Sequence, residues 1–377
     1  MARAVYLDHN ATTPIRPEAA QAVVQAMELV GNSSSVHRFG RLARRWVEDA
    51  REAVAALAGG AAGRVIFTSG GTEANNLALR GTGRPRLLIS AGEHDSVLQA
   101  VPEAELIPLT GDGRVDPEEV TRRLAADPRP ALVSVMLANN ETGVIQPIQE
   151  IAARAHQAGA LVHCDAVQAA GKIPLDMAAL DVDLLSLSAH KLGGPQGVGA
   201  LLAAEEVSLR PLLRGGGQER GRRAGTENLP GIAGFGAAAQ AAAAELADFG
   251  QVGRLRDDLE RRVTDWAPSA RVFGAAAPRL ANTSCLTMPG VGAETQVMAL
   301  DLAGVAVSAG SACSSGKVRP SHVLAAMAVA EPEAGWAIRV SLGRHSQAED
   351  VDAFLEAWMA LYSRTRRQAP LGQRKTA

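Results

Sequence analysis

Residues 161–191 read LVHCDAVQAAGKIPLDMAALDVDLLSLSAHK, and this stretch decides the fold class. It contains two short aliphatic runs, residues 161–164 and 183–187, each followed at once by polar side chains. Outward from it, residues 64–203 alternate such runs with longer amphipathic stretches, a pattern typical of βαβ units around a mostly parallel sheet. We therefore predict an α/β fold, and the other expected strands are residues 65–68, 86–90, 132–137 and 198–202.

Helix signals agree with this alternation. Asp116 is expected to cap a helix that has Pro117 at its first position and Glu119 at its third. Residues 147–158 form a second amphipathic pattern, which Gly159 ends. Both helices fall between predicted strands, as a parallel sheet requires.

The pattern changes after an alanine-rich helix near residues 231–248. A charged helix at 254–262, a strand at 337–342 and a helix opened by a capping box of Ser346 and Glu349 indicate a second, smaller α+β unit. The expected division is an N-terminal segment joining the small domain (1–15), a large cofactor-binding domain (16–248), a small C-terminal domain (249–365) and a polar tail (366–377).

Composition narrows the function classes. The 377 residues include 38 Lys+Arg against 40 Asp+Glu, and aromatic residues make up 3%. Without a basic footprint or aromatic platforms, direct binding of nucleic acid is not expected, and no stretch predicts a membrane span. Three cysteines without a Cys-x-x-Cys pair indicate free thiols, so we expect a cytoplasmic protein. The chain has only four lysines: Lys172, Lys191, Lys317 and Lys375. Because arginine supplies most of the positive charge, a lysine in a glycine-rich setting requires a chemical reason.

Polar clusters follow the predicted strands. In an open parallel sheet ligands bind outside the carboxyl ends of the strands, so the clusters predict a shared small-molecule site. The first cluster passes through Gly70 and Gly71 into a helix, whose free N–H groups suit a phosphate, with Ser188 and His190 as further donors; the alternative is a plain connection. The five clusters are residues 69–72, 93–94, 139–141, 165–168 and 188–191.

Lys191 and Asp165 carry the most specific chemistry among these clusters. Lys191 lies in a weakly charged, tightly turned segment, where desolvation favours a nucleophilic amine; the alternative is a surface lysine. Asp165 follows a strand, where it can keep a pyridine nitrogen protonated. The pairing favours pyridoxal phosphate over a simple aldolase.

Three further residues have two interpretations each. His94 can stack on a flat ring and move protons, or it is a hydrogen-bonded loop histidine. Asn140 and Arg339 can hold a carboxylate, or Arg339 is a salt-bridge partner.

Cys313 lies in the segment Ser308-Ala-Gly-Ser-Ala-Cys-Ser-Ser-Gly316, among small residues that bury little. Small residues allow many backbone conformations, so such a loop can carry a thiol to a pocket. The cysteine has no packing role there that would explain its presence. Cys164 and Cys285 are expected to be ordinary packing residues.

The chain resembles the cysteine desulfurases of the NifS/IscS type, members of the class V aminotransferase group of fold-type I pyridoxal-phosphate enzymes. The resemblance runs nearly end to end, from Tyr6-Leu-Asp-His-Asn-Ala-Thr-Thr-Pro14 to Ile338-Arg-Val-Ser-Leu-Gly343. Between these lie Thr68-Ser-Gly-Gly-Thr-Glu-Ala-Asn-Asn76, Asn139-Asn-Glu-Thr-Gly143, His163-Cys-Asp-Ala-Val-Gln168, Ser188-Ala-His-Lys191, Arg223-Ala-Gly-Thr-Glu-Asn228 and the Cys313 segment. Motifs this numerous, in this order, are highly specific.

The resemblance implies a role for each matching residue. Lys191 would carry the pyridoxal 5'-phosphate, and Cys313 would be the nucleophile that takes the sulfur. His94 would stack on the ring and transfer protons, with Asp165 at the ring nitrogen and Gln168 at the ring hydroxyl. The phosphate would be held by Gly71, Thr72, Ser188 and His190, with Thr226 from the other subunit of a homodimer, and the substrate carboxylate by Asn32, Asn140 and Arg339.

The implied activity converts L-cysteine to L-alanine and leaves the sulfur on Cys313 as a persulfide. A sulfur acceptor, such as an iron–sulfur scaffold protein or a tRNA-thiolation enzyme, would then receive it. No intrinsic metal is expected, although Cys313 would be able to ligate a transient iron–sulfur cluster through its persulfide. The alternatives are a selenocysteine lyase or a small amino acid aminotransferase of the same fold; a non-catalytic scaffold would not need both Lys191 and Cys313.

Overall fold

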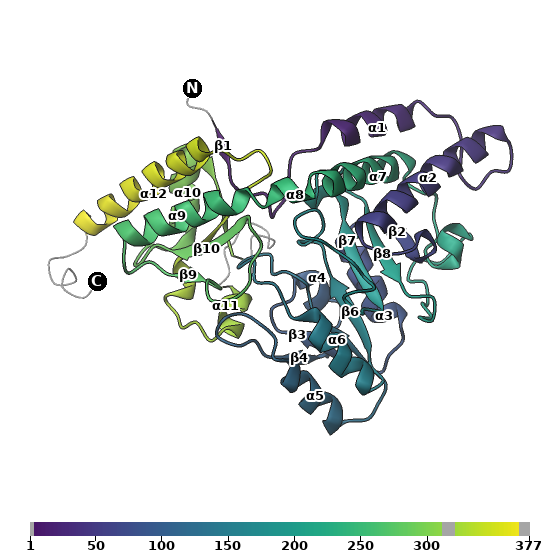
Figure 1. The fold of residues 1–377 in the computed structure, drawn as a ribbon, viewed down its shortest axis with the longest axis horizontal. Helices are drawn as coiled ribbons and strands as arrows, with labels where there is room; N and C mark the ends of the chain where they lie inside the picture. Colours follow the sequence, from purple (N-terminus) through teal and green to yellow (C-terminus); the bar gives the residue numbers. More distant parts are fainter. Residues whose placement is uncertain (1–3, 311–320, 369–377) are drawn as a thin grey trace.

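The computed structural model describes residues 4–310 and 321–368. A seven-stranded sheet lies at the centre of the larger part of the chain (Figure 1). Strand β8 runs antiparallel to both of its neighbours and the remaining pairs are parallel, so the predicted α/β fold with a mostly parallel sheet is confirmed. The spatial order is β2 (Val65–Thr68), β8 (Gly199–Ala203), β7 (Leu184–Ser188), β6 (Leu161–Asp165), β5 (Ala131–Ser134), β3 (Arg86–Ser90) and β4 (Glu105–Ile107).

Helices cover both faces of this sheet. Successive side chains of each strand point to opposite faces, so both faces carry apolar side chains that must be buried. Phe67 of β2 packs in one core with Val54 and Phe235. The preceding residue, Ile66, points to the opposite face and packs with Leu77 in a separate core. The helices of this part are α1 (Pro17–Met27), α2 (Arg38–Leu57), α3 (Gly71–Gly81), α4 (Asp95–Leu98), α5 (Pro117–Ala126), α6 (Ile148–Gln157), α7 (Leu229–Ala244) and α8 (Leu246–Phe249).

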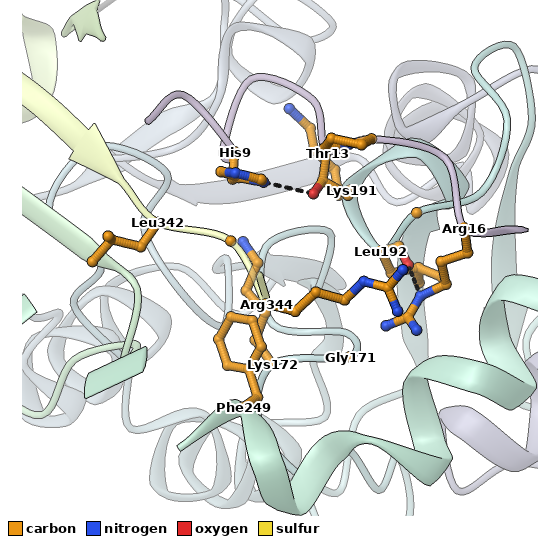
Figure 2. Close-up of a pocket in the computed structure, with 13 residues that line it drawn as sticks. His9, Thr13, Arg16, Gly171, Lys172, Lys191, Leu192, Phe249, Leu342 and Arg344 are labelled. Atoms are coloured by element: carbon orange, nitrogen blue, oxygen red, sulfur yellow. Dashed lines mark hydrogen bonds between the residues drawn. The ribbon is translucent and has the colours of Figure 1, made fainter. Parts of the chain in front are cut away.

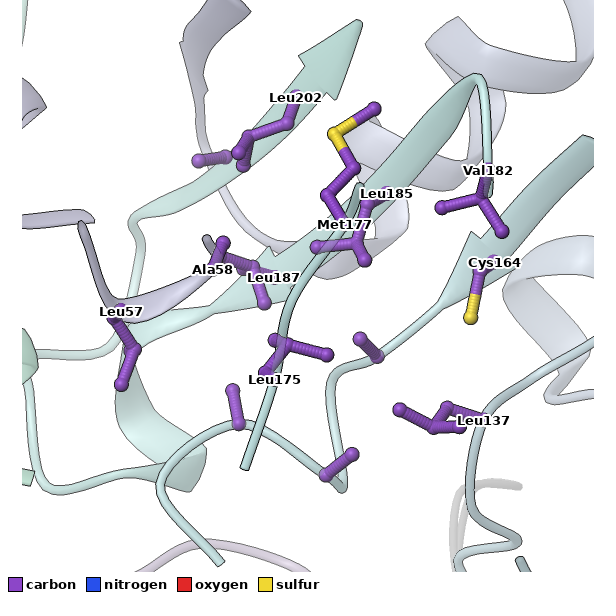
Figure 3. Close-up of a cluster of buried hydrophobic side chains, with 14 of the residues drawn as sticks. Leu57, Ala58, Leu137, Cys164, Leu175, Met177, Val182, Leu185, Leu187 and Leu202 are labelled. Carbon is purple, nitrogen blue, oxygen red and sulfur yellow. The ribbon is translucent and has the colours of Figure 1, made fainter. Parts of the chain in front are cut away.

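Cys164 is a packing residue, as predicted. Its side chain is fully buried in the same core as Leu185 and Leu187 of the neighbouring strand (Figure 3). Burial raises the pKa of the Cys164 thiol well above its usual range, so this sulfur is an inert neutral thiol. Cys285 is likewise buried, in a core of the C-terminal part.

The C-terminal part has its own antiparallel sheet, in the order β12 (Ser308–Ala309), β13 (Ala337–Ser341), β10 (Thr283–Thr287) and β9 (Val272–Phe273). The N-terminal strand β1 (Val5–Tyr6) pairs in parallel with β11 (Val305–Ala306), so the start of the chain lies against its C-terminal part. The domain boundaries at residues 15, 248 and 365 stay a prediction. The helices here are α9 (Val252–Trp266), α10 (Ala293–Leu302), α11 (His322–Ala326) and α12 (Ala348–Gln368).

Two local predictions meet different outcomes. The Asp116 side chain caps α5 by accepting a hydrogen bond from the Glu118 amide, as expected. The capping box at Ser346 is wrong: Ser346 Oγ accepts from the Gly343 amide, and the helix begins two residues later. The Asp350 carboxylate takes the capping role instead, by accepting from the Gln347 amide at 2.9 Å.

Membrane insertion receives no support from the helices. In residues 4–310 and 321–368, no helix is long and apolar enough to cross a bilayer.

Candidate active site

A cavity of about 320 Å³ opens where the parallel strands end. It brings together ten of the predicted site residues, which come from both the large sheet and the C-terminal part. Those ten are Gly71, Thr72, His94, Asn140, Asp165, Gln168, Ser188, His190, Lys191 and Arg339.

Asp165 lies at the last position of β6, in the wall of the cavity. One carboxylate oxygen accepts a hydrogen bond from the Val167 amide at 2.9 Å. The other accepts from Asn75 Nδ2 on α3 at 2.7 Å. These two donors fix the orientation of the carboxylate from both sides, so it presents a defined acceptor to a ligand.

Lys191 ends a short 3₁₀ turn, η2 (Ala189–Lys191), directly after β7. Its Nζ donates to the backbone carbonyl oxygens of Asn10 at 2.6 Å and Ala11 at 2.7 Å. The N-terminal segment therefore holds the amine in place. Next to it, His190 has its pKa lowered to about 4 by burial and by the Lys191 charge, so its imidazole is neutral near neutral pH.

His94 caps α4 with its ring. Nδ1 accepts from the Ser96 amide at 3.0 Å and lies 2.8 Å from Ser96 Oγ. Because Nδ1 accepts a hydrogen bond, the ring proton of the neutral form is assigned to Nε2. The ring also lines the cavity.

Arg339 projects from β13 with donors at fixed positions. One terminal nitrogen donates to Asp8 Oδ1 at 2.6 Å and the other to the Asn140 carbonyl oxygen at 3.1 Å. The buried Nε of Arg339 has no hydrogen-bond partner among the described residues. Arg339 lines the cavity, so a carboxylate ligand there would meet its guanidinium, as the predicted substrate-binding role requires.

Two buried acids lie beside the cavity. Burial, together with the nearby Asp165 charge, raises the pKa of Glu93 well above its usual range. Burial also raises the pKa of Glu141, whose carboxylate accepts from Ser321 Oγ at 2.5 Å. In both acids, burial therefore opposes the charged form.

The cavity suits the predicted cofactor. Gly71 begins α3 at the cavity wall, and a Cβ built there would lie 3.0 Å from Val167 Cγ2 and 3.4 Å from Ser188 Cβ, so a larger residue would crowd this wall. Helix N–H groups and the Ser188 hydroxyl form a donor set for a phosphate. An imidazole, a carboxylate and an amine line the same space, as a phosphorylated pyridine aldehyde requires.

Two predicted residues lie outside this cavity. Asn32 is exposed between α1 and α2, where its Oδ1 accepts from the Ser34 amide. Thr226 is exposed before α7. Their neighbours are joined, because Ser33 Oγ donates to Glu227 Oε2 at 2.7 Å, so both residues belong to one surface. Cys313 lies outside the described residues.

Sequence reasoning assigned no role to Asn10, which the structure places at the centre of a buried network. Its carbonyl oxygen accepts from Lys191 and from Gln168 Nε2, and its Nδ2 donates to Thr283 Oγ1. The signal was present in the motif of residues 6–14, but no spacing rule connects that motif with Lys191. Asn75 and His322 were also missed and line the cavity.

Comparison with known proteins decides the family. The family model described as aminotransferase class-V matches residues 5–354. The chain belongs to the class V aminotransferase family. Members of this family use pyridoxal phosphate, and the family assignment made from the sequence motifs is confirmed.

Individual class V relatives are similar along their whole length. A cysteine desulfurase of Cereibacter sphaeroides is 46% identical, with 98% of each chain covered. The crystal structure of a NifS-like protein from Rickettsia africae has 35% identity and a TM-score of 0.90 over 96% of this chain and 100% of that one. The structure of SspA in complex with cysteine has 28% identity and a TM-score of 0.78 over 91% of this chain and 100% of that one.

Proposed function

We propose that this chain is a pyridoxal-phosphate-dependent cysteine desulfurase. The observation that carries the proposal is the convergence of Lys191, Asp165, His94 and Arg339 on one cavity that Gly310 also lines. The reaction is L-cysteine plus the Cys313 thiol giving L-alanine plus a Cys313 persulfide. One C–S bond breaks and one S–S bond forms, and the thiol proton of Cys313 balances the hydrogen gained by alanine.

The cofactor would be held by residues of the cavity wall. Lys191 would hold its aldehyde carbon, Asp165 its ring nitrogen and Gln168 its ring hydroxyl, with His94 against the ring. When bound, the cofactor supplies an electron sink for the α-carbon of the amino acid. The phosphate would be bound by Gly71, Thr72, Ser188 and His190, with Thr226 of a second copy.

The substrate carboxylate would bind Arg339. Asp8 and the Asn140 carbonyl hold the two terminal nitrogens of this arginine, which fixes its guanidinium beside the cavity. Asn140 and Asn32 would complete the carboxylate site. A family neighbour in complex with cysteine supports this choice of substrate.

Proton transfer would use Lys191 and His94. The Lys191 amine, released when substrate takes its place, would move the α-proton. His94 carries its proton on Nε2 because Nδ1 accepts from Ser96, so this nitrogen would donate to the reacting group.

We expect Cys313 to reach the cavity, because the described residues on both sides of its segment lie at the cavity wall. Cys313 is three residues after Gly310, and three extended residues span at most about 11 Å. Gly310 itself lines the cavity, and Ser321, at the other flank of the segment, donates to Glu141 of the cavity wall. The thiol would attack the substrate sulfur as a thiolate.

A homodimer would complete the site. The surface with Asn32 and Thr226 also carries exposed apolar side chains, including Met27, Val36 and Phe39. Apolar residues at 59–87% exposure in one region are expected to be covered by another molecule. We place a second copy of the chain there, because it would bring Thr226 to the phosphate of its neighbour.

The sulfur would leave the enzyme on Cys313. The acceptor class is a protein thiol, such as that of an iron–sulfur scaffold, and Cys313 would be able to ligate a transient cluster through its persulfide. Because Cys313 must be a free thiol before it can take up sulfur, and free thiols persist in a reducing compartment, we place the protein in the cytoplasm.

The test is the amount of alanine and sulfide released from L-cysteine by the purified protein with a reductant. We expect equal amounts from the wild type and none from Cys313→Ala, whose cofactor absorbance stays normal. Alanine release at the wild-type rate by Cys313→Ala would move the nucleophile elsewhere. A wild type that consumes an amino donor without releasing sulfur would indicate an aminotransferase.

A further inference from the structure

Lys172 is a buried lysine to which the desulfurase reaction assigns no role. It lies seven residues after Asp165 and is 8% exposed. Its Nζ donates to Gln168 Oε1 at 2.8 Å and to Asn10 Oδ1 at 3.0 Å. In the part of the chain that the structure describes, no carboxylate forms an ion pair with Lys172. A lysine buried against two neutral oxygens costs stability, so its presence requires a reason beyond packing.

Gln168 is held by two groups. Its Oε1 accepts from Lys172, and its Nε2 donates to the Asn10 carbonyl oxygen at 2.9 Å. A flipped amide would place Nε2 against the Lys172 donor and Oε1 against a carbonyl, losing both hydrogen bonds. The ammonium form of Lys172 has N–H groups and no lone pair, so it enforces this orientation, which the Asn10 carbonyl also favours.

We propose that Lys172 is a positioning residue that fixes the Gln168 amide with an N–H, and not the carbonyl oxygen, toward the cofactor cavity. The inference rests on the proposed function, because it assigns the second Nε2 hydrogen of Gln168 to the ring hydroxyl oxygen of the cofactor. An N–H at that oxygen stabilises its negatively charged form. A flipped Gln168 would present a carbonyl oxygen there and destabilise it.

Lys172 and Lys191 also share a small second cavity of about 30 Å³, lined by His9, Arg16 and Arg344 as well (Figure 2). This volume holds one or two waters, so solvent screens the two amines poorly. Burial lowers the pKa of Lys172 well below its usual range, and the charges of Lys191 and Arg339 add to the effect. Around this region, Arg16 and Arg344 form ion pairs with Glu245. The negative charges of Asp8 and Asp350 raise the pKa of His9, which burial lowers more strongly.

The test is a pH titration of the absorbance of the cofactor bound to Lys191 in the purified holoenzyme. We expect the midpoint of Lys172→Met to rise by about one pH unit, because the ring oxygen loses its donor and its proton is held more tightly. Lys172→Arg keeps a donor facing Gln168 and is expected to titrate near the wild type.

A double-mutant cycle with Gln168→Leu separates positioning from charge. If Lys172 acts through Gln168, Lys172→Met shifts the midpoint much less in the Gln168→Leu background than in the wild type. Equal shifts in both backgrounds, no shift at all, or a shift of Lys172→Arg equal to that of Lys172→Met would each overturn the proposal. If Lys172→Met fails to fold, Lys172→Gln replaces it in the cycle, because a neutral amide removes the obligate donor and still packs in this polar site.

The proposed function fails independently of this inference. A wild type that binds no pyridoxal phosphate, or that binds it and releases no sulfide, contradicts the desulfurase assignment. A wild type that does both, with an unshifted Lys172→Met, contradicts only the role of Lys172.

Discussion

The cavity beside Lys191 and the surface with Asn32 and Thr226 differ in how much of their structure one chain supplies. In the cavity, protein donors and acceptors already hold the functional groups: Asn75 orients Asp165, and the Asn10 carbonyl holds Lys191. On the surface, Asn32 and Thr226 are exposed, and Asn32 Oδ1 accepts only from the nearby Ser34 amide among the described residues. The comparison teaches that the groups of the cavity are preorganised within one chain, whereas in the proposed homodimer a second copy would complete the phosphate and carboxylate sites.

Replacement of Lys191 should produce the largest effect on the cavity. We expect Lys191→Ala to abolish the absorbance of the lysine-bound cofactor and to lower desulfurase activity by about a thousandfold or more, since the covalent attachment and a proton-transfer group are both lost. Absorbance spectroscopy of the purified variant checks this, with circular dichroism as a control for folding. An unchanged spectrum would mean that another lysine, such as Lys172, carries the cofactor.

A charge introduced on the surface with Asn32 and Thr226 should weaken association of the proposed dimer. Phe39→Glu would place a carboxylate in the proposed dimer contact, so we expect association to weaken by about a hundredfold or more. Light scattering across a range of concentrations measures the mass. Leu106→Glu is the matched control, because Leu106 is 50% exposed on the edge strand β4 and should leave the mass unchanged. A dimer that survives Phe39→Glu at all concentrations would place the interface elsewhere.

Mixed dimers test whether Thr226 acts across the interface. We expect Thr226→Ala to weaken cofactor binding by about ten- to thirtyfold through loss of a hydrogen bond to the charged phosphate. A heterodimer of one Thr226→Ala chain and one Lys191→Ala chain should keep one intact site and about half of the wild-type activity, because the intact Lys191 faces the intact Thr226. Activity at about half the level of the Thr226→Ala homodimer would show that Thr226 serves its own chain.

The same division explains what the sequence predicts. The ends of β6 and β7 fall within one residue of their expected positions, because a buried parallel strand reads as a continuous apolar run that stops at polar residues. The cavity residues that follow these strands were found for the same reason. Strand β4, by contrast, is short, lies at the sheet edge and carries exposed Leu106, so it has no such run and was missed.

Contacts between segments that are distant in the sequence were also not predicted. Asn10 meets Lys172 and Gln168 across about 160 positions of sequence, and no local pattern encodes that approach. Ser346 and Glu349 match a capping box by spacing, but Ser346 Oγ is used by the Gly343 amide, so the helix starts later. In the proposed homodimer, the positions of Asn32 and Thr226 relative to a ligand would depend on a second chain, which one sequence does not describe.

The smallest expected effect sharpens the claim that the cavity is preorganised. Asn75→Ala removes the donor to Asp165 Oδ2 but leaves the Val167 amide on the other oxygen, so we expect about a fivefold loss of cofactor affinity, the value of one hydrogen bond. Asn76→Ala is the matched control: the next residue of α3 donates to the Thr72 and Ser96 carbonyl oxygens and not to Asp165. Cofactor titration of the apoenzyme, followed by fluorescence, compares the two. Equal losses would mean that α3 as a whole, and not the Asn75 hydrogen bond, sets the affinity; an Asn75→Ala protein with wild-type affinity would mean that Asp165 needs no support to face the ring nitrogen.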